Sequence, residues 1–324
     1  MRLEHLGERR LISRIRRAFG EKRRDILLGI GDDAALVRGP ERLLLTTDVL
    51  VEDEDFRIDD HPPRLLGRKA LNVNLSDIAA MGGRPLHALL GMAMPGDVEE
   101  SWLRQFMSGF RAAAREAGVA LVGGDLSQAD KIVIAVTLTG DVKSPVARGG
   151  ARPGDGIFVS GTLGDAAGGL RLLEKGGIRG VVKAVRPLVG AFLDPTPRLR
   201  LGAVLARRRL VSAMIDISDG LSVDLAHICQ ESGVGAEIEA SRIPISAALE
   251  RFARDPLPLA LNGGEDFELL FTVRPSNLAA VERLARRFEL TRIGRVTAGR
   301  RVFLLGPDKK RTPLRPRGFE HFRK

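Results

Sequence analysis

The sequence predicts a two-domain protein of the α/β or α+β class, with helices and strands mixed in both domains. Its 324 residues are more than one hydrophobic core usually supports. Both halves alternate short apolar or β-branched runs with longer stretches of helical periodicity. A Gly- and Pro-rich segment at 148–155 separates the halves. We therefore place the domains at residues 1–147 and 148–324.

In the first domain, the spacing of apolar residues predicts helices at 6–19, 65–81 and 98–117. The second of these begins after Pro62–Pro63 and is ended by Gly82–Gly83. Strands are expected where β-branched or apolar runs lie between turn residues. The predicted strands are 26–30, 34–37, 43–48, 86–94, 119–122 and 131–140.

The same criteria apply to the second domain. The predicted helices are 166–173, 197–206, 221–232 and 277–288. The predicted strands are 157–160, 213–216, 236–238, 267–272 and 291–296.

Composition limits the class of protein and its partners. The formal net charge is +10, which leaves a nucleic-acid-binding protein open as an alternative from a different class. Aromatic residues are only 4% and Tyr is absent, so a stacking platform for single strands is not expected, and we predict no nucleic-acid partner. The single Cys229, a polar and basic N-terminal stretch and the lack of a long apolar run predict a soluble cytoplasmic protein with no membrane partner.

Several common active-site motifs are absent. No Gly-Lys dipeptide occurs, which excludes a Walker A loop, and G-x-S-x-G is missing. Residues 29–34 match G-x-G-x-x-A, but an apolar strand follows where the dinucleotide fingerprint needs a helix. The five histidines form no H-x-x-x-H pair, so a zinc site is not expected. Cys229 lies on the apolar face of the 221–232 helix and is predicted to be a buried structural thiol.

Carboxylates recur beside Gly, Ser or Thr at the ends of apolar runs. The stretch from Asp48 to Asp60 contains seven carboxylates. Mg²⁺ takes oxygen ligands, usually one or two carboxylates with water and substrate phosphates. The sequence thus predicts a phosphate-handling enzyme that uses several Mg²⁺ ions. The recurring segments are 31–33, 46–48, 76–77, 123–125, 216–220 and 263–266.

In the first domain, three of these segments place oxygen ligands close together in sequence. Thr46, Thr47 and Asp48 are expected to end a strand, where a hydroxyl, a carbonyl and a carboxylate can share Mg²⁺. Asn74 and Asp77 are three residues apart on a helix and therefore share a face. We expect Asp48, Asp77 and Asp125 to act together as a metal cradle.

In the second domain, Asp216 and Asp219 bracket Ser218 just before a predicted helix. The free N–H groups at a helix N-terminus bind anions, so this position suits a phosphate with its metal. A plain N-cap by Ser218 or Asp219 is the alternative, and both roles can coexist.

Eight segments carry these acids together with characteristic neighbours, and they span most of the chain. They are G-I-G-D-D-A-A-L (29–36), T-T-D-V-L-V-E (46–52), K-A-L-N-V-N-L-S-D-I-A-A-M-G (69–82), G-G-D (123–125), R-x-G-A-R-P-G-D (148–155), I-D-I-S-D-G-L-S-x-D-L-x-H-I (215–228), N-G-G-E-D-F-E-L-L-F (262–271) and G-F-E-H-F (318–322).

In this order the segments resemble the thiamine-monophosphate kinase family, part of the superfamily of aminoimidazole ribonucleotide synthetase. The resemblance implies direct in-line transfer of the γ-phosphoryl group of ATP to thiamine monophosphate, with several Mg²⁺ ions. It also implies a homodimer. The N-terminal domain would bind metal and ATP and contribute strands to a β-barrel at the dimer interface, and the C-terminal domain would be an α/β layer. The alternative is another ATP-dependent member of the superfamily with a different acceptor.

The resemblance also implies roles for individual residues. Nucleotide contacts would fall on Gly124, Asp125, Arg148 and Ser218, and substrate contacts on Glu265 and Phe319. The family usually has His where this chain has Asp55, so a substrate contact by Asp55 departs from the family pattern, although a carboxylate there suits a cationic thiazolium. Metal ligands would be Asp33, Thr46, Thr47, Asp48, Asp77, Asp125, Asp216 and Asp219.

Overall fold

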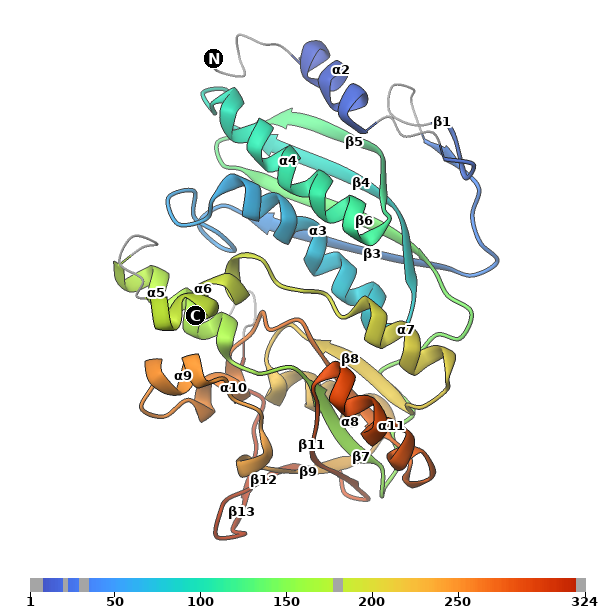
Figure 1. The fold of residues 1–324 in the computed structure, drawn as a ribbon, viewed down its shortest axis with the longest axis vertical. Helices are drawn as coiled ribbons and strands as arrows, with labels where there is room; N and C mark the ends of the chain where they lie inside the picture. The colour runs from blue at the N-terminus through green and yellow to red at the C-terminus, as the bar shows by residue number, and fades with distance from the viewer. Residues whose placement is uncertain (1–7, 20–22, 29–34, 177–182, 319–324) are drawn as a thin grey trace. The chain divides into compact units, whose positions relative to one another are not determined.

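The computed structural model describes residues 8–19, 23–28, 35–176 and 183–318. The chain forms two compact units (Figure 1). Unit 1 comprises Met1–Ile78 and Gly83–Lys143, and unit 2 comprises Ala79–Gly82 and Ser144–Lys324. The main boundary between the units lies between Lys143 and Ser144. The boundary expected from the sequence lies four residues later, before Arg148.

Unit 1 is built on a four-stranded sheet with the strand order β3-β6-β4-β5. The pairs β3–β6 and β6–β4 are antiparallel, and β4–β5 is parallel. Helices α3 and α4 lie on one face of this sheet (Figure 1). The elements are α2 (Glu8–Phe19), β1 (Ile26–Leu28), β2 (Leu36–Val37), β3 (Leu43–Val51), α3 (Pro63–Ala80), β4 (Arg84–Met94), α4 (Glu100–Ala117), β5 (Ala120–Gln128) and β6 (Val133–Asp141).

The two faces of this sheet differ in burial because side chains alternate along a strand. On β6, Ile134, Val136 and Leu138 are buried on the helix-covered face. We call the other face the open face; it carries exposed apolar side chains on β3 and β4. They are Leu43, Leu45, Val49 and Leu89, which are 47%, 68%, 51% and 43% exposed.

Helices α3 and α4 approach each other closely enough to require glycine at the contact. A Cβ on Gly109 would lie 1.8 Å from the Arg64 carbonyl oxygen, and one on Gly67 would lie 2.0 Å from that of Phe106. The close packing fixes α3 over the sheet, and α3 carries the residues of the 69–82 segment.

Unit 2 contains a seven-stranded sheet with the strand order β13-β12-β9-β11-β7-β10-β8. All neighbouring pairs are antiparallel except β12–β9. The elements are β7 (Gly156–Ser160), α5 (Asp165–Gly176), α6 (Arg186–Leu193), α7 (Leu199–Arg207), β8 (Ala213–Ile217), α8 (Leu221–Ser232), β9 (Gly235–Glu239), α9 (Ala247–Phe252), α10 (Leu257–Asn262), β10 (Glu268–Val273), α11 (Leu278–Phe288), β11 (Leu290–Thr297), β12 (Val302–Leu305) and β13 (Arg311–Pro313).

The strands β7, β10 and β8 of this sheet are buried on both faces, with a separate core on each face. Ile215 and Ile217 of β8 pack with Leu225 of α8 on one face. Met214 of the same strand packs on the other face with Leu205 of α7. Burial on both faces explains why β8 and β10 are apolar nearly throughout rather than alternating.

The predicted class is confirmed: the chain has a two-domain α/β fold with mixed sheets. Most predicted helices and strands are present with ends shifted by a few residues. The prediction missed α6, α9, α10, β12 and β13. These are short elements, of three to eight residues, too short to show a period in sequence.

Two strands run further than predicted, which moves two acidic segments. Thr46–Asp48 does not end β3, because the strand continues to Val51. Gly123–Asp125 does not follow a strand but lies inside β5. Adjacent residues of both segments must therefore point to opposite faces of the sheet.

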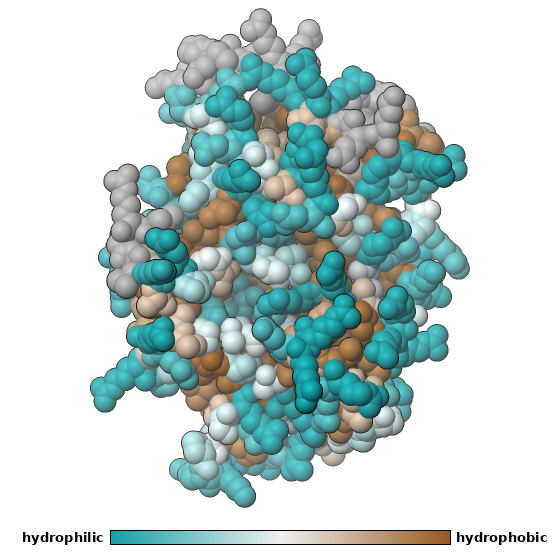
Figure 2. Space-filling view, viewed as in Figure 1, coloured by the Kyte–Doolittle hydropathy of each residue, from teal (hydrophilic) through white to brown (hydrophobic). Residues whose placement is uncertain are grey.

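No helix within the described ranges is long and apolar enough to cross a membrane. On the face of the molecule seen in Figure 2, hydrophilic residues predominate and hydrophobic ones form small separate areas.

Candidate active site

In unit 1, Thr46, Asp48 and Asp77 form one group of oxygen ligands. Thr46 and Asp48 are two apart on β3 and so share a face. The Thr46 hydroxyl donates a hydrogen bond to the Asp77 carboxylate on α3. The pKa of Asp48 is raised from 3.8 to about 6, mainly by burial and then by the negative charges of Asp77 and Asp55. A cation here would relieve that repulsion, because an opposite charge favours the ionised carboxylate.

Asn74 supports the interpretation of this group as a metal site. It lies one helical turn before Asp77, and its side chain is 0% exposed. Its amide nitrogen donates to the Ala70 carbonyl at 3.2 Å, but its Oδ1 has no hydrogen-bond partner in the described part of the chain. An unpaired buried oxygen costs about 1–3 kcal/mol. Carboxylate and amide oxygens are ligands suited to Mg²⁺, so the residues fit this ion.

Thr47 faces away from this group. Its hydroxyl donates to the Val136 carbonyl at 3.1 Å and accepts from the Thr137 hydroxyl at 3.1 Å on the open face. The side chain of Thr47 therefore does not join Thr46 and Asp48, and a metal contact by Thr47 stays a prediction.

Asp55 lies in the turn after β3. One oxygen of its carboxylate accepts a hydrogen bond from the Val51 N–H at 2.8 Å. Asp55 also contributes to the raised pKa of Asp48, so it adds negative charge near the group. The carboxylate stabilises its own turn and at the same time extends the acidic surface beside Asp48.

Gly124 and Asp125 are separate from this group. They lie on edge strand β5, and β4 and β6 stand between β5 and β3, a separation of about 14 Å at the usual strand spacing. Asp125 pairs with Gly91 and is exposed, and Gly91 belongs with Leu89 to the open face. A cradle of Asp48, Asp77 and Asp125 is thus not formed within one chain. Asp33, also a predicted metal ligand, lies outside the described residues.

In unit 2, the segment from Asp216 to Gly220 joins β8 to α8. Asp216 is buried at 4% exposure, and Ser218 and Asp219 are half-buried. Gly220 is the N-cap residue, with φ +118°, and as a glycine it offers no side chain to cap the helix. The predicted capping by Ser218 or Asp219 is therefore wrong. The first N–H groups of a helix have no partner within the helix, so the start of α8 suits binding of an anion.

The G-G-E-D segment is hydrogen-bonded to the Asp216–Gly220 segment. The N–H of Glu265 donates to the Ser218 carbonyl at 2.7 Å, and that of Phe267 donates to the Ile217 carbonyl at 2.8 Å. A Cβ on Gly264 would lie 2.5 Å from the Ser218 oxygen, so only glycine allows this approach. Glu265 itself has φ +66°, an uncommon conformation for a residue with a side chain. Glu265 and Ser218 are thus held side by side.

Asp266, in the same segment, has a structural role. Its carboxylate accepts hydrogen bonds from the backbone N–H groups of Gly164 at 2.8 Å and Ala166 at 3.5 Å, at the start of α5. Burial raises the pKa of Asp266 well above its ordinary value. Asp266 therefore anchors the segment that presents Glu265, and this acid is not free for a cation.

The C-terminal end of the described chain also reaches this place. The Ser222 hydroxyl lies 2.9 Å from Asn262 Oδ1 and 3.0 Å from the Arg317 carbonyl oxygen, and it accepts from the Arg317 N–H at 3.1 Å. Ser222 thus joins α8, α10 and the C-terminal segment. Phe319, the predicted substrate contact two residues later, lies outside the described residues.

Arg148 is not brought to the Ser218 segment. The residues after it, Gly150 and Ala151, donate N–H groups to the Ser232 hydroxyl at 3.1 Å each. Ser232 ends α8, whereas Ser218 precedes its start, and a helix of 12 residues is about 18 Å long. Arg148 is exposed at the far end of α8.

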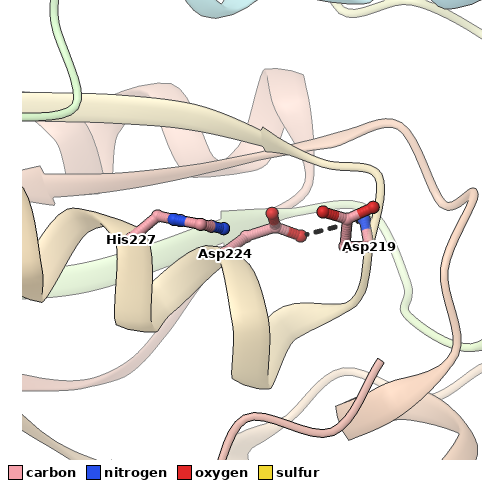
Figure 3. Close-up of side chains that lie close together, drawn as sticks. All are labelled: Asp219, Asp224 and His227. Carbon is pink, nitrogen blue, oxygen red and sulfur yellow. Dashed lines mark hydrogen bonds between the residues drawn. The ribbon is translucent and has the colours of Figure 1, made fainter. Parts of the chain in front are cut away.

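Two residues near Asp219 were missed from the sequence. Asp224 and His227 lie on α8 three residues apart and face Asp219 (Figure 3). The sequence signal for this pair is an Asp followed three residues later by a His, within 215–228. A search for two histidines in the pattern H-x-x-x-H does not find such a pair. Cys229, by contrast, is buried as predicted, and burial raises the pKa of its thiol to about 11.

Comparison with known proteins identifies the relatives of this chain. The family described as AIR synthase related protein matches with its N-terminal domain at residues 31–142 and its C-terminal domain at residues 152–306. The thiamine-monophosphate kinase of Aquifex aeolicus (strain VF5) is 40% identical, over 99% of this chain and 100% of the relative.

Solved structures agree with this relationship. The crystal structure of thiamine-monophosphate kinase from Stenotrophomonas maltophilia K279a has a TM-score of 0.84 at 40% identity, covering 93% of this chain and 96% of that one. A structure of AaThiL complexed with AMPPCP and TMP has a TM-score of 0.79 at 38% identity, covering 99% of both chains. The chain therefore belongs to the thiamine-monophosphate kinase family, within the AIR synthase related proteins.

Proposed function

We propose that this protein transfers the γ-phosphoryl group of ATP to thiamine monophosphate, giving thiamine diphosphate. The observation that carries the proposal is the likeness, over 99% of both chains, to AaThiL complexed with AMPPCP and TMP. The arrangement in unit 2 supports it, since an anion-binding helix start, an acidic segment and Glu265 are hydrogen-bonded together.

The reaction does not require a general base. The nucleophile is a phosphate monoester whose second pKa is about 6, so it is largely ionised at neutral pH. The main obstacle is repulsion between two polyanions. Bound Mg²⁺ would neutralise this charge and help to align an in-line displacement.

We propose that Asp48 and Asp77 in unit 1, and Asp216 and Asp219 in unit 2, hold Mg²⁺. The Thr46 hydroxyl orients the Asp77 carboxylate through their hydrogen bond. The remaining positions that the family resemblance implies are retained as proposals on that ground. They are Asp33, Thr47 and Asp125 for metal, and Gly124, Asp125, Arg148 and Ser218 for ATP.

On the acceptor side, we propose that Glu265, Phe319 and Asp55 contact thiamine monophosphate. The backbone N–H of Glu265 donates to the Ser218 carbonyl, and the neighbouring Asp266 is fixed by its hydrogen bond from the Gly164 N–H. A carboxylate at position 55 attracts the cationic thiazolium ring, and Asp55 lies close enough to Asp48 to raise its pKa.

We further propose that the active protein is a homodimer formed through the open face of unit 1. Leu45 at 68% and Val49 at 51% exposure are large apolar side chains on a regular sheet face. Contiguous exposed apolar side chains mark interaction sites. The N-terminal domain, residues 1–147, would thus serve both metal binding and dimerisation, with residues 148–324 as the second domain.

The test is formation of thiamine diphosphate and ADP from thiamine monophosphate, ATP and Mg²⁺ by the purified protein. We expect activity that requires both substrates and is abolished by a chelator. Asp77→Asn should lower turnover by about two decades or more, whereas the exposed Asp59→Asn should leave it unchanged. ADP release with another acceptor, and never with thiamine monophosphate, would refute the proposal in favour of a different superfamily member.

A further inference from the structure

Unit 2 contains a group of three metal-ligating side chains at the start of α8, formed by Asp219, Asp224 and His227 (Figure 3). One ligand atom from each lies within 4.8 Å of the other two. Asp224 and His227 are three residues apart on the helix and so project from one side of it. Asp219 comes from the segment just before the helix.

Asp224 is buried, and both of its hydrogen bonds to described residues go to the same carboxylate oxygen. The side chain is 1% exposed. Its Oδ2 accepts the backbone N–H groups of Asp219 at 3.3 Å and Gly220 at 3.1 Å. Its Oδ1 makes no hydrogen bond to any described residue.

His227 adds a nitrogen ligand to the group. It is half-buried, and neither ring nitrogen is hydrogen-bonded within the described part of the chain. In Figure 3 the imidazole points toward Asp224, which lies between His227 and Asp219. The carboxylates of Asp219 and Asp224 and the imidazole of His227 thus lie close together. An imidazole nitrogen of His227 and Oδ1 of Asp224 are available to bind an ion.

We propose that Asp219, Asp224 and His227 bind a divalent transition-metal ion, of which Zn²⁺ is the representative. Imidazole is a good ligand for Zn²⁺, and three protein ligands with an open fourth position form a common zinc site. Mg²⁺ is bound mainly by oxygen. The proposed ion therefore differs from the Mg²⁺ of the phosphoryl transfer, although Asp219 belongs to both proposed sites.

The site would have a clear effect on its surroundings. An ion on Asp224 Oδ1 would fix the carboxylate whose other oxygen holds the N–H groups of Asp219 and Gly220. The segment before α8 would then be fixed by the hydrogen bonds to Asp224 and by the ion bound to Asp219. The site does not depend on the proposed kinase activity, because it needs no nucleotide or acceptor.

The experiment is calorimetric titration of the full-length protein with Zn²⁺ in the absence of ATP and thiamine monophosphate. The titration is run both without and with excess Mg²⁺, because Asp219 belongs to both proposed sites. We expect one Zn²⁺ site per chain in the wild type. His227→Gln should weaken it by at least the roughly 10–100-fold that loss of an outer-shell partner costs.

Two further variants separate ligation from folding. Asp224→Asn keeps an oxygen that can accept the two backbone N–H groups but removes the charge, so it should also weaken Zn²⁺ binding. Glu231→Gln removes an exposed carboxylate from the other end of the same helix and should leave it unchanged. Circular dichroism spectra confirm that each variant is folded.

The outcomes are distinct. Wild-type affinity for Zn²⁺ in His227→Gln, or no Zn²⁺ binding by the wild type even without Mg²⁺, would overturn the proposed site. Neither result bears on the kinase proposal, which is tested by thiamine diphosphate formation. Loss of that activity would likewise leave the Zn²⁺ titration unaffected.

Discussion

Replacing Asp48 with Asn should stabilise the metal-free protein while lowering its activity. The pKa of Asp48 is raised from 3.8 to about 6, first by burial and then by Asp77 and Asp55. At about 1.4 kcal/mol per pKa unit, ionising this carboxyl at neutral pH costs the folded state up to about 3 kcal/mol. Asn is nearly the same size and carries no charge, so Asp48→Asn removes that cost.

The effect has a defined pH dependence. A folded-state pKa above the unfolded value means that the folded state binds the proton more tightly. The wild type therefore loses stability as the pH rises from about 4 to about 6, and the loss is complete above that. The difference in unfolding free energy between Asp48→Asn and the wild type should be near zero at pH 4 and largest at pH 7.

The assay is urea unfolding in a chelator at a series of pH values, followed by circular dichroism. Asp59→Asn, an exposed acid from the same run, is the control and should show no such gain. Adding Mg²⁺ should stabilise the wild type more than Asp48→Asn, because a ligand stabilises the state that binds it. A gain in stability that is the same at pH 4 and pH 7, or no gain at all, would refute the electrostatic reasoning.

Three other substitutions test separate parts of the structure. Asp55→Asn should raise the KM for thiamine monophosphate more than it lowers kcat, with the KM for ATP unchanged. Asp55→His should be tolerated. An unchanged KM for thiamine monophosphate in Asp55→Asn would show that this turn does not touch the acceptor. Leu45→Glu on the open face should give monomers in analytical ultracentrifugation, and a wild-type sedimentation profile would place the interface elsewhere. Glu268→Gln removes the carboxylate that accepts from Arg198 Nε at 2.7 Å, which should lower the free energy of unfolding, measured with urea, by about 3 kcal/mol. An unchanged free energy of unfolding would show that the pair is not stabilising.

The arrangement of local elements could be predicted because its signals are short-range. Leu221–Ser232 is a helix with the bounds that its apolar period predicted, and β8 comes just before it. The closeness of Asp216, Ser218 and Asp219 follows from their positions in the chain. Chain length predicted two domains, and the family resemblance added the expectation of a kinase.

Which face of a sheet a side chain occupies was decided by strand length and register. Thr47 and Asp48 are adjacent in sequence, yet only Asp48 shares a face with Thr46, because β3 continues through all three. Asp125 is separated from Asp48 because β6 and β4 are placed between their strands. Alternation in a strand can be read only once its ends and partners are known.

The sequence by itself determined the helices and strands with a clear period, the oxygen-rich segments and the relationship to a kinase family. Only the tertiary structure decided which of these segments meet. Glu265 is hydrogen-bonded to Ser218, and Ser222 to Arg317, across long stretches of chain. The reason is physical: such contacts form when the packing of the whole sheet offsets the entropy of closing the intervening loops, and no local pattern of residues records that balance.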